Sequence, residues 1–595
     1  MSDKKENIWI LTFEYDGVIK LGGLGEVTGN QSKNLSDAFN FTVFIPSHGQ
    51  TERLTSQRDF QKFSFKSTGN VKLANLGLSE TEEIYKISYY KFDFNGVNVI
   101  LLNGENEFSK KYLNDKSVYN PDTFNGKLFL YTLGVKSFIK HLISNEEKDL
   151  PKVIHLHDYH VVPSFITIKQ ELIKNKLDVS SIITIHLLTW PLYELNFIKA
   201  CGIDETPITI RLKNGIKLMN INQIYELCQG EKSNRETRPP SMEKIGALIS
   251  DLVITVSKSY LKSSIIPKLG GEIKFKTDFV WNGCDWDYYE IYENVLDSLG
   301  KEIREVLNIP KISQISRSAL KEYLLTYKIG NLEKSPLITS EKVLKIINEI
   351  SNGNIFIKNG NITPFENSGP LAISTGRISK QKGFDMIFEA IPSVVEAIPN
   401  AKFLLLILPT EYSLTEIKEY AQYVKKYSAN LRIVFGVAPS IFNLAHISAD
   451  IYLALSKWEP FGIIVLEAMA SKLPVIATKV GGMQETLIDL KEDPERGTGV
   501  FIKEDSVSQL STSIISLFKS ARVSEKIKLS DKERLNIIEE IPDDKIKALI
   551  KKDPQYFSKL RENCYKRVDK NFRWKKVSKK LRKLYYRLIE LNKTK

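Results

Sequence analysis

The stretch IWILTFEYDGVIKLGGLGEV (residues 8–27) joins an apolar run to a glycine-rich turn and then to a helical pattern. The apolar run predicts a buried strand, and residues 24–38 predict a helix. Gly22, Gly23 and Gly25 stand between the two, close to Lys20. Glycine lets a backbone turn sharply and approach a ligand closely, so a bound phosphate is one interpretation. The alternative is a tight strand-to-helix turn with a solvated lysine.

Strand-like and helical patterns alternate along the rest of the chain, which predicts parallel sheets covered by helices. In the first half, we expect strands at 7–13, 41–47, 97–103, 153–158, 181–188 and 252–257, and helices at 24–38, 126–144, 162–176 and 241–250. In the second half, we expect strands at 371–376, 402–408, 431–436, 451–456 and 474–479, and helices at 383–397, 413–428, 440–446 and 463–471. The sequence therefore predicts two doubly wound α/β domains, residues 1–280 and 281–565, with a joint between 257 and 290.

Three stretches interrupt this alternation. Residues 205–240 contain two alternating runs around Asn214-Gly215, which is typical of a β-hairpin, and we interpret them as an insertion. Residues 290–369 carry helical patches and NGNIFIKNGN, and form an irregular insertion in the second domain. Residues 525–552 are highly charged and helical in pattern.

The composition is that of an ordinary globular protein with more than one domain. Of its 595 residues, 42% are hydrophobic and 26% are charged. We find no long apolar run and no basic-plus-apolar leader, so we expect no membrane span and a cytoplasmic protein. Four widely spread cysteines fit a reducing compartment and indicate no metal site. Richness in Ile, Lys and Glu is typical of a thermophile. The sequence leaves open whether the protein forms a homo-oligomer.

The formal net charge of +13 raises the question of nucleic-acid binding. Much of the excess lies in RWKKVSKKLRKLYYRL (573–588), where apolar residues recur at helical spacing. An amphipathic helix with its lysines in solvent explains this charge. We therefore expect no nucleic-acid partner, and note that a basic protein suits small anionic substrates.

Polar side chains follow several of the predicted strands. In open α/β sheets, ligands bind beyond the carboxyl ends of the strands. Arg377 and Lys382 lie five residues apart in one such loop, and two cations there suit a diphosphate. The alternative is an exposed loop with ordinary surface cations.

Glu459 and Glu467 form an E-x7-E pattern across a strand end and the helix that follows. The second carboxylate is placed to accept hydrogen bonds from a ribose diol, and the helix start offers amides to an anion. Gly481-Gly482 repeats this arrangement one strand later.

The histidines have more than one interpretation. His155 and His157 alternate on a strand and share a face, so a metal site with Asp158 and His160 is conceivable, although no further ligand cluster supports it. His186 follows another strand, where it lines a sugar pocket or serves as a core histidine.

Taken together, these motifs resemble the glycogen and starch synthases, and archaeal-type glycogen synthases in particular. KLGGLG (20–25), preceded by Glu14, looks like the family's lysine–glycine loop, and HLHDYH (155–160) resembles its His-Asp-Trp-His stretch. TIHLLTW, LVITVSKSYLKS and VWNGCDWDYY are similar to further family segments, and GRISKQKGFD and EPFG to its sugar-nucleotide motifs. The tail FRWKKVSKKLRKLYYRLIE resembles a closing helix that crosses back to the first domain, here residues 566–595. The resemblance covers about 1–290 and 371–595.

The resemblance implies two Rossmann-like domains facing across a cleft, the GT-B architecture, and a retaining hexosyltransferase. The enzyme would extend an α-1,4-glucan primer with glucose from ADP-glucose or UDP-glucose, without a metal or other cofactor. Lys20, Gly22 and Gly23 would contact the donor, and preplaced Arg377 and Lys382 would stabilise the leaving diphosphate. Glu459 would contact the sugar, Glu467 the ribose, and His186 the glucose 6-hydroxyl and the cationic sugar centre. Glu14, Asp158 and Tyr159 would lie on the acceptor side, with Gly481 and Gly482 on the donor side.

The sequence departs from the family pattern at several positions. Leu187 stands where the family usually has Asn, and Ser241 where an Asn contacting glucose is common. Tyr159 replaces Trp, and Glu467 stands where many bacterial members carry Gln. An ion-pair and a covalent route to retention both stay open, as does the nucleotide.

Two other functions compete with glucan synthesis. One is a related E-x7-E transferase that makes a small glycoside, and the other is a non-catalytic glucan-binding scaffold. The lysine–glycine loop and HDYH favour the synthase over the first, and the intact candidate residues argue against the second.

Overall fold

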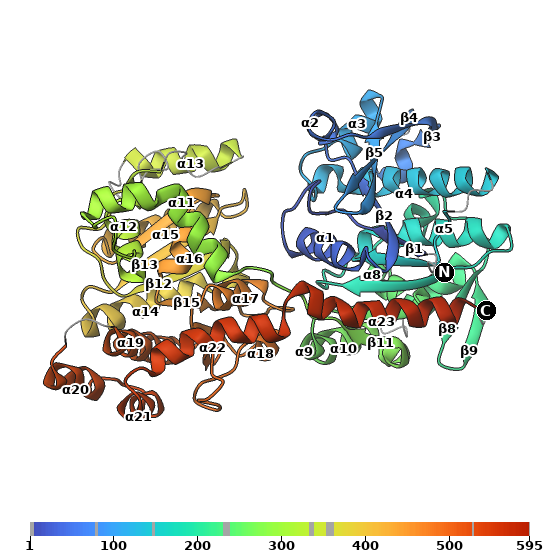
Figure 1. Cartoon of the computed structure of the whole chain (residues 1–595). Helices are drawn as coiled ribbons and strands as arrows, with labels where there is room; N and C mark the ends of the chain where they lie inside the picture. The colour runs from blue at the N-terminus through green and yellow to red at the C-terminus, as the bar shows by residue number, and fades with distance from the viewer. Residues whose placement is uncertain are drawn as a thin grey trace. The chain divides into compact units, whose positions relative to one another are not determined.

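The computed structural model describes residues 5–77, 81–145, 149–229, 238–332, 338, 340–352, 362–525 and 529–593. The chain divides into two compact units, Met1–Asn282 with Trp574–Lys595, and Gly283–Arg573 (Figure 1). Asn282 lies within the expected joint at 257–290, two residues beyond the predicted boundary at 280. Parts of all three interrupting stretches, including 230–237, 353–361 and 526–528, lie outside the described residues.

The elements of the first unit alternate as the sequence predicts. The strands are β1 (Glu6–Leu11), β2 (Phe39–Pro46), β3 (Gln61–Lys72), β4 (Glu82–Phe94), β5 (Val97–Gly104), β6 (Val153–His157), β7 (Ser180–Ile185), β8 (Ile208–Leu212), β9 (Gly215–Met219), β10 (Leu252–Thr255) and β11 (Thr277–Phe279). The helices are α1 (Gly23–Leu35), α2 (Thr51–Gln57), α3 (Glu107–Leu113), α4 (Pro121–Ser144), α5 (Val162–Lys174), α6 (Leu195–Ala200), α7 (Ile221–Gln229), α8 (Met242–Ile249), α9 (Lys258–Tyr260), α10 (Ile266–Leu269) and α23 (Trp574–Lys593).

The nine-stranded sheet of this unit has the order β11-β10-β7-β6-β1-β2-β5-β4-β3. All neighbours are parallel except β5–β4 and β4–β3. From β1 the chain first builds outward through β2 and later returns to add β6 on the other side. The strand order therefore reverses between β1 and β6, and ligands bind at such a switch point in doubly wound sheets.

Helices cover both faces of this sheet. One apolar core joins the strands to α4, α5 and α8, and includes Phe129, Phe165 and Ile245. The other joins them to α1 and α23, where Leu581, Tyr585 and Leu588 are buried. Figure 1 shows α23, in red, lying along the strands of this first unit. The last helix thus completes a core that the N-terminal strands began.

The predicted helix over 566–595 is two helices in the structure. α22 (Tyr556–Asn571) belongs to the second unit, and α23 begins at Trp574 in the first. Phe572 and Trp574 are both fully buried, each in its own unit. The helical path is interrupted between them, where the chain passes from the second unit back to the first.

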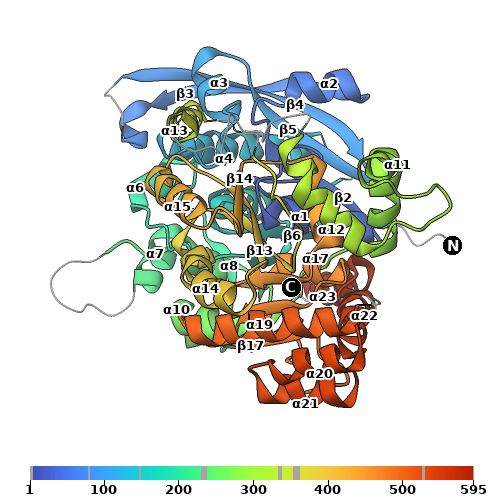
Figure 2. The ribbon, with the colours of Figure 1, turned by 90° about the vertical axis from the view of Figure 1, so that its left-hand side faces the viewer.

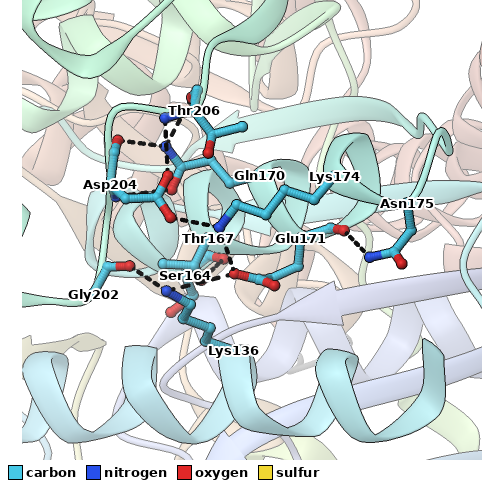
Figure 3. A network of polar contacts seen from close by, with 10 residues as sticks. All are labelled: Lys136, Ser164, Thr167, Gln170, Glu171, Lys174, Asn175, Gly202, Asp204 and Thr206. Carbon is cyan, nitrogen blue, oxygen red and sulfur yellow. Dashed lines mark hydrogen bonds and ion pairs between the residues drawn. The ribbon is translucent and has the colours of Figure 1, made fainter. Parts of the chain in front are cut away.

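The predicted hairpin is confirmed, since β8 and β9 pair antiparallel around Lys213-Asn214, with Leu212 opposite Gly215. Its status as an insertion stays a prediction. Polar side chains of α5, together with Lys136 of α4, hold the segment that leads into the hairpin (Figure 3). Gln170 donates to the carbonyls of Asp204 and Thr206 at 2.7 and 2.9 Å, and the Nζ of Lys136 donates to the carbonyl of Gly202 at 2.5 Å. Partial burial raises the pKa of Asp204, but hydrogen bonds from Lys174 and Thr206 outweigh it and lower the pKa to about 2. The hairpin is therefore anchored at its base by hydrogen bonds and charge.

The second unit contains a six-stranded parallel sheet with the order β14-β13-β12-β15-β16-β17. Its strands are β12 (Leu371–Arg377), β13 (Lys402–Leu408), β14 (Leu431–Phe435), β15 (Ile451–Ala454), β16 (Val475–Thr478) and β17 (Gly499–Ile502). In chain order this is 3-2-1-4-5-6, the dinucleotide-fold order, with its switch point between β12 and β15.

Helices of the second unit pack on its sheet or on one another. They are α11 (Tyr288–Leu307), α12 (Arg317–Thr326), α13 (Glu341–Asn352), α14 (Phe384–Ala397), α15 (Leu414–Lys426), α16 (Pro439–Ser448), α17 (Ile463–Ala470), α18 (Met483–Thr486), α19 (Val507–Ser524), α20 (Asp531–Glu539), α21 (Asp544–Lys552) and α22. The predicted irregular insertion at 290–369 contributes α12, α13 and most of α11, and the charged stretch at 525–552 forms α20 and α21 beside α19 (Figure 2).

Candidate active site

The lysine–glycine loop follows β1 and is held by Glu14. Oε2 of Glu14 accepts hydrogen bonds from the backbone amides of Leu21 and Gly22 at 2.8 and 3.0 Å. Its Oε1 accepts from the hydroxyl of Tyr119 at 2.7 Å. The Gly22 amide assigned to the donor is thus engaged by a carboxylate of the same loop, and Glu14, assigned to the acceptor side, also shapes that loop.

Lys20 and Gly23 lie at the two ends of this loop. Lys20 is half exposed and forms an ion pair with Glu26 in the first turn of α1. Gly23 is the first residue of α1, where backbone amides have no partner within the helix. A cation and free amides at one helix start suit an anionic ligand.

Asp158 follows β6 on the other side of the switch point. Its backbone has φ 62° and ψ −177°, an extended positive-φ conformation that is found almost only for glycine. Its Oδ1 accepts the backbone amide of His186 at 2.7 Å and so ties the ends of β6 and β7 together. Burial raises the pKa of Asp158 to about 8, although the amide hydrogen bond opposes this. The neighbouring Tyr159 is partly exposed, with its pKa also raised by burial.

His186 contacts the histidines of β6. Its Nε2 lies 2.9 Å from Nδ1 of His157, and the two rings are stacked. His155 lies behind them, with Nδ1 2.7 Å from the hydroxyl of Tyr585 and Nε2 2.6 Å from that of Thr184. Burial lowers the pKa of His186 to about 3, and that of His155 as far, so both rings are neutral at pH 7.

These contacts bear on the metal hypothesis for His155, His157, Asp158 and His160. The ring nitrogens of His155 are both taken by hydroxyl partners, and Nδ1 of His157 faces another imidazole. Within the described parts of the chain, no group of three His, Cys, Asp or Glu side chains is placed to hold a metal ion.

Glu243 supports the loop after β7, a role that sequence reasoning missed. This buried carboxylate on α8 accepts the backbone amides of Thr189 and Trp190, both at 2.9 Å, through Oε1. Its Oε2 accepts from the hydroxyl of Ser241 at 2.9 Å. Ser241 itself caps α8, so its hydroxyl serves the fold at the position where the family often has Asn.

In the second unit, the candidate cations lie in the loop after β12. Arg377 is exposed at the end of that strand. The Nζ of Lys382 lies 2.8 Å from Oε2 of Glu459, which follows β15. The side chains of this pair are 20% and 14% exposed, so both are within reach of a ligand. The structure therefore brings Lys382 and Glu459 together at the strand switch point.

Glu467 lies on α17, the helix that begins just after the loop carrying Glu459. Tyr452 connects the two carboxylates: burial raises its pKa, and the charges of Glu467 and Glu459 raise it further. Its hydroxyl is 2.7 Å from that of Thr375 on β12. The two acids of the E-x7-E pattern are thus both near enough to Tyr452 for their charges to act on its hydroxyl.

Gly481 and Gly482 are required by close packing. Gly481 has φ 45°, and a Cβ there would lie 1.9 Å from the carbonyl oxygen of Glu459. A Cβ on Gly482 would lie 2.4 Å from Cα of Phe461, and its amide donates to the Glu459 carbonyl at 3.0 Å. These glycines let the loop after β16 lie directly against the Glu459 loop. Close packing therefore requires glycine at both positions, independently of any role in phosphate binding.

The two units together have the fold of a known class of enzymes. The catalytic domain of starch synthase IV from Arabidopsis thaliana superposes with a TM-score of 0.61 at 15% identity, covering 94% of this chain and 99% of that one. The chain thus has the GT-B architecture of glycosyltransferases with two Rossmann-like domains, as the sequence predicts. Among the described residues, no helix combines the length and hydropathy that a membrane span needs.

Sequence comparisons narrow this class to a family. Residues 7–274 match the starch synthase catalytic domain, and residues 357–536 match glycosyl transferases group 1. A glycogen synthase from Hydrogenobaculum sp. is 24% identical over 498 residues, 83% of this chain and 86% of that protein. A probable glycogen synthase from Methanocaldococcus jannaschii is 32% identical over 140 residues, which are 22% of this chain and 26% of that protein. The chain therefore combines a starch synthase catalytic domain with a group 1 glycosyl transferase domain, and is a glycosyltransferase similar to the glycogen synthases over most of its length.

Proposed function

We propose that this glucosyltransferase uses a nucleoside diphosphate glucose as donor and an α-1,4-glucan primer as acceptor, and that it needs no metal. ADP-glucose is the first donor to test, because the starch synthase IV structure contains ADP together with acarbose. UDP-glucose is the alternative. The similarity to glycogen and starch synthases supports a glucan as the acceptor. The charged loops of the second unit support a nucleoside diphosphate sugar as the donor.

The observation with most weight is the Lys382–Glu459 pair at the β12–β15 switch point. Negative charge grows on the diphosphate as the glucose–phosphate bond breaks, so a fixed lysine stabilises the transition state more than the ground state. Arg377, exposed in the same loop, adds a guanidinium that can bind two phosphate oxygens at once. Glu459 then contacts the sugar and Glu467 the ribose.

In the first unit, the neutral imidazole of His186 hydrogen-bonds the glucose 6-hydroxyl. The backbone carbonyl and the ring dipole of His186 stabilise the positive charge that develops on the sugar, and the neutral ring adds no second positive charge there. Lys20 and the start of α1 contact the donor phosphates, and Asp158 and Tyr159 contact the acceptor. A cytoplasmic location is part of this proposal, supported by four buried cysteines that are not joined in disulfides.

The test is to incubate the protein with glycogen and each of ADP-glucose and UDP-glucose, and to measure nucleoside diphosphate release. We expect release with one donor, dependent on glycogen, and growth of the glucan chains. Parallel reactions with glucose 6-phosphate as acceptor test for a small-glycoside transferase. Release with that acceptor and none with glycogen would replace the proposed function, and no release with any pair would favour a binding scaffold.

A further inference from the structure

A row of buried histidines connects the C-terminal helix to the candidate residue His186. Tyr585 on α23 contacts His155 on β6, at 2.7 Å. The ring of His155 lies 4.0 Å, centroid to centroid, from that of His157. His157 in turn contacts His186 at 2.9 Å. Every member belongs to the first unit.

The row is costly to bury, which argues that it does more than fill space. Tyr585 and the two histidines of β6 are each at most 1% exposed. A polar ring buried away from water needs hydrogen-bond partners to offset the loss of solvent, whereas aliphatic side chains would fill a strand face without needing any. The exposed end of the row is His186, which is only partly buried. The row therefore runs from the apolar core to the sugar-binding end of β7.

The contact with His157 decides which nitrogen His186 can offer to a ligand. A neutral imidazole has one N–H donor and one acceptor nitrogen. Because Nε2 of His186 faces Nδ1 of His157, one of these two nitrogens donates to the other. The nitrogen of His186 that remains for a sugar hydroxyl is Nδ1. Without His157, rotation about the Cβ–Cγ bond would exchange Nδ1 with Cδ2 and Nε2 with Cε1, so that a ring carbon would take the place of Nδ1.

We propose that His157 is a positioning residue for glucosyl transfer, which fixes the ring of His186 so that Nδ1 meets the glucose 6-hydroxyl. His155 supports His157 from behind, and Tyr585 extends that support to α23. This inference rests on the proposed role of His186, and goes beyond it by assigning a task to a histidine that does not itself reach the substrate.

The test compares the glucosyl donor that the protein accepts with its 6-deoxy analogue. The measured quantity is the ratio of kcat/KM for the two donors. A variant that merely folds less well loses the same fraction of activity with both donors, so the ratio does not move. In the wild type, we expect the 6-deoxy donor to be poorer by about tenfold or more, because a site hydrogen bond is left unmade.

Four variants decide the outcome. His186→Ala should bring the ratio close to one. His157→Leu should do nearly the same, whereas His157→Asn should restore most of the ratio, since its amide lies where Nδ1 of histidine lies. The matched control is His446→Leu, which removes another fully buried histidine, hydrogen-bonded only within its own helix through the Phe442 carbonyl at 2.8 Å. It should leave the ratio unchanged.

The results separate the two ideas. A wild-type ratio in His186→Ala would overturn the role of His186 and the proposal with it. A collapsed ratio in His186→Ala together with a wild-type ratio in His157→Leu would overturn the positioning role alone. If His157→Leu does not fold, His157→Asn and His157→Gln are compared instead, because glutamine carries its amide one bond too far. Equal ratios in those two variants would then count against the proposal.

Discussion

The candidate residues of the two units differ in how charge is used. In the first unit, His186 is neutral and held through both its ring and its backbone amide. In the second, Lys382 and Glu459 form an ion pair that solvent and ligand can reach. A fixed neutral group suits a hydroxyl, whereas a charged and less buried pair suits a diphosphate that arrives with its own charge. The same strand-end geometry thus serves two kinds of recognition.

The strongest test of this contrast is to remove a charge from the second unit. Lys382→Ala should lower turnover by roughly 10²–10³-fold, the usual loss for one preplaced group that stabilises developing charge. Lys380→Ala, two residues earlier and exposed, is the matched control and should keep near-wild-type turnover. Steady-state kinetics on folded protein, verified by circular dichroism, measures both. Near-full activity in Lys382→Ala would remove the diphosphate role.

A second test removes the support of the lysine–glycine loop in the first unit. Glu14→Leu leaves the amides of Leu21 and Gly22 without their acceptor, and we expect the donor KM to rise by about tenfold. Glu14→Gln keeps a carbonyl oxygen and should change KM much less. If the two variants have the same donor KM, the carboxylate does not organise this loop.

A third test concerns the protonation of Asp158. Its pKa is about 3.8 in the unfolded chain and is raised to about 8 in the folded protein, mainly by burial. The folded state therefore holds this proton more tightly, so stability from Asp158 is present at low pH and is lost as pH rises from about 4 to about 8. Asp158→Asn should remove that loss. The melting temperatures of wild type and variant, measured from pH 5 to pH 8, should diverge with pH, and parallel curves would contradict the raised pKa.

The smallest expected effect is that of a chelator. Because Lys20, Arg377 and Lys382 supply positive charge themselves, EDTA should leave the rate unchanged. Loss of activity in EDTA that magnesium or manganese restores would show that these three cations do not suffice.

The sheet cores were predictable because buried parallel strands appear as continuous apolar runs. Predicted and observed strands agree to within a few residues, as for 402–408 and β13. β3 and β4 were not predicted, because they form an antiparallel sheet edge whose exposed faces carry lysines, serines and glutamates. β17 was also missed, although it is no shorter than β10, β15 and β16, which were predicted.

The candidate site was predictable where it follows a strand. Arg377, Lys382 and Asp158 are examples, because parallel strands point their carboxyl ends to one edge. Tyr119 and Glu243 were not predictable. Their contacts reach across 105 and 54 residues, to Glu14 and Thr189, and no local pattern marks them.

The placement of α23 has a consequence for synthesis on the ribosome. Its Tyr585 packs on Phe39 and Phe41 of the first sheet, yet residues 283–573 are translated before it. At about 5–20 residues per second, that interval lasts roughly a quarter of a minute to a minute. Throughout it, two phenylalanine rings of the nascent first domain lack their cover, while the second domain emerges whole. The domain encoded first is therefore the last to be completed, and a recombinant first domain needs residues 574–593 joined behind Asn282.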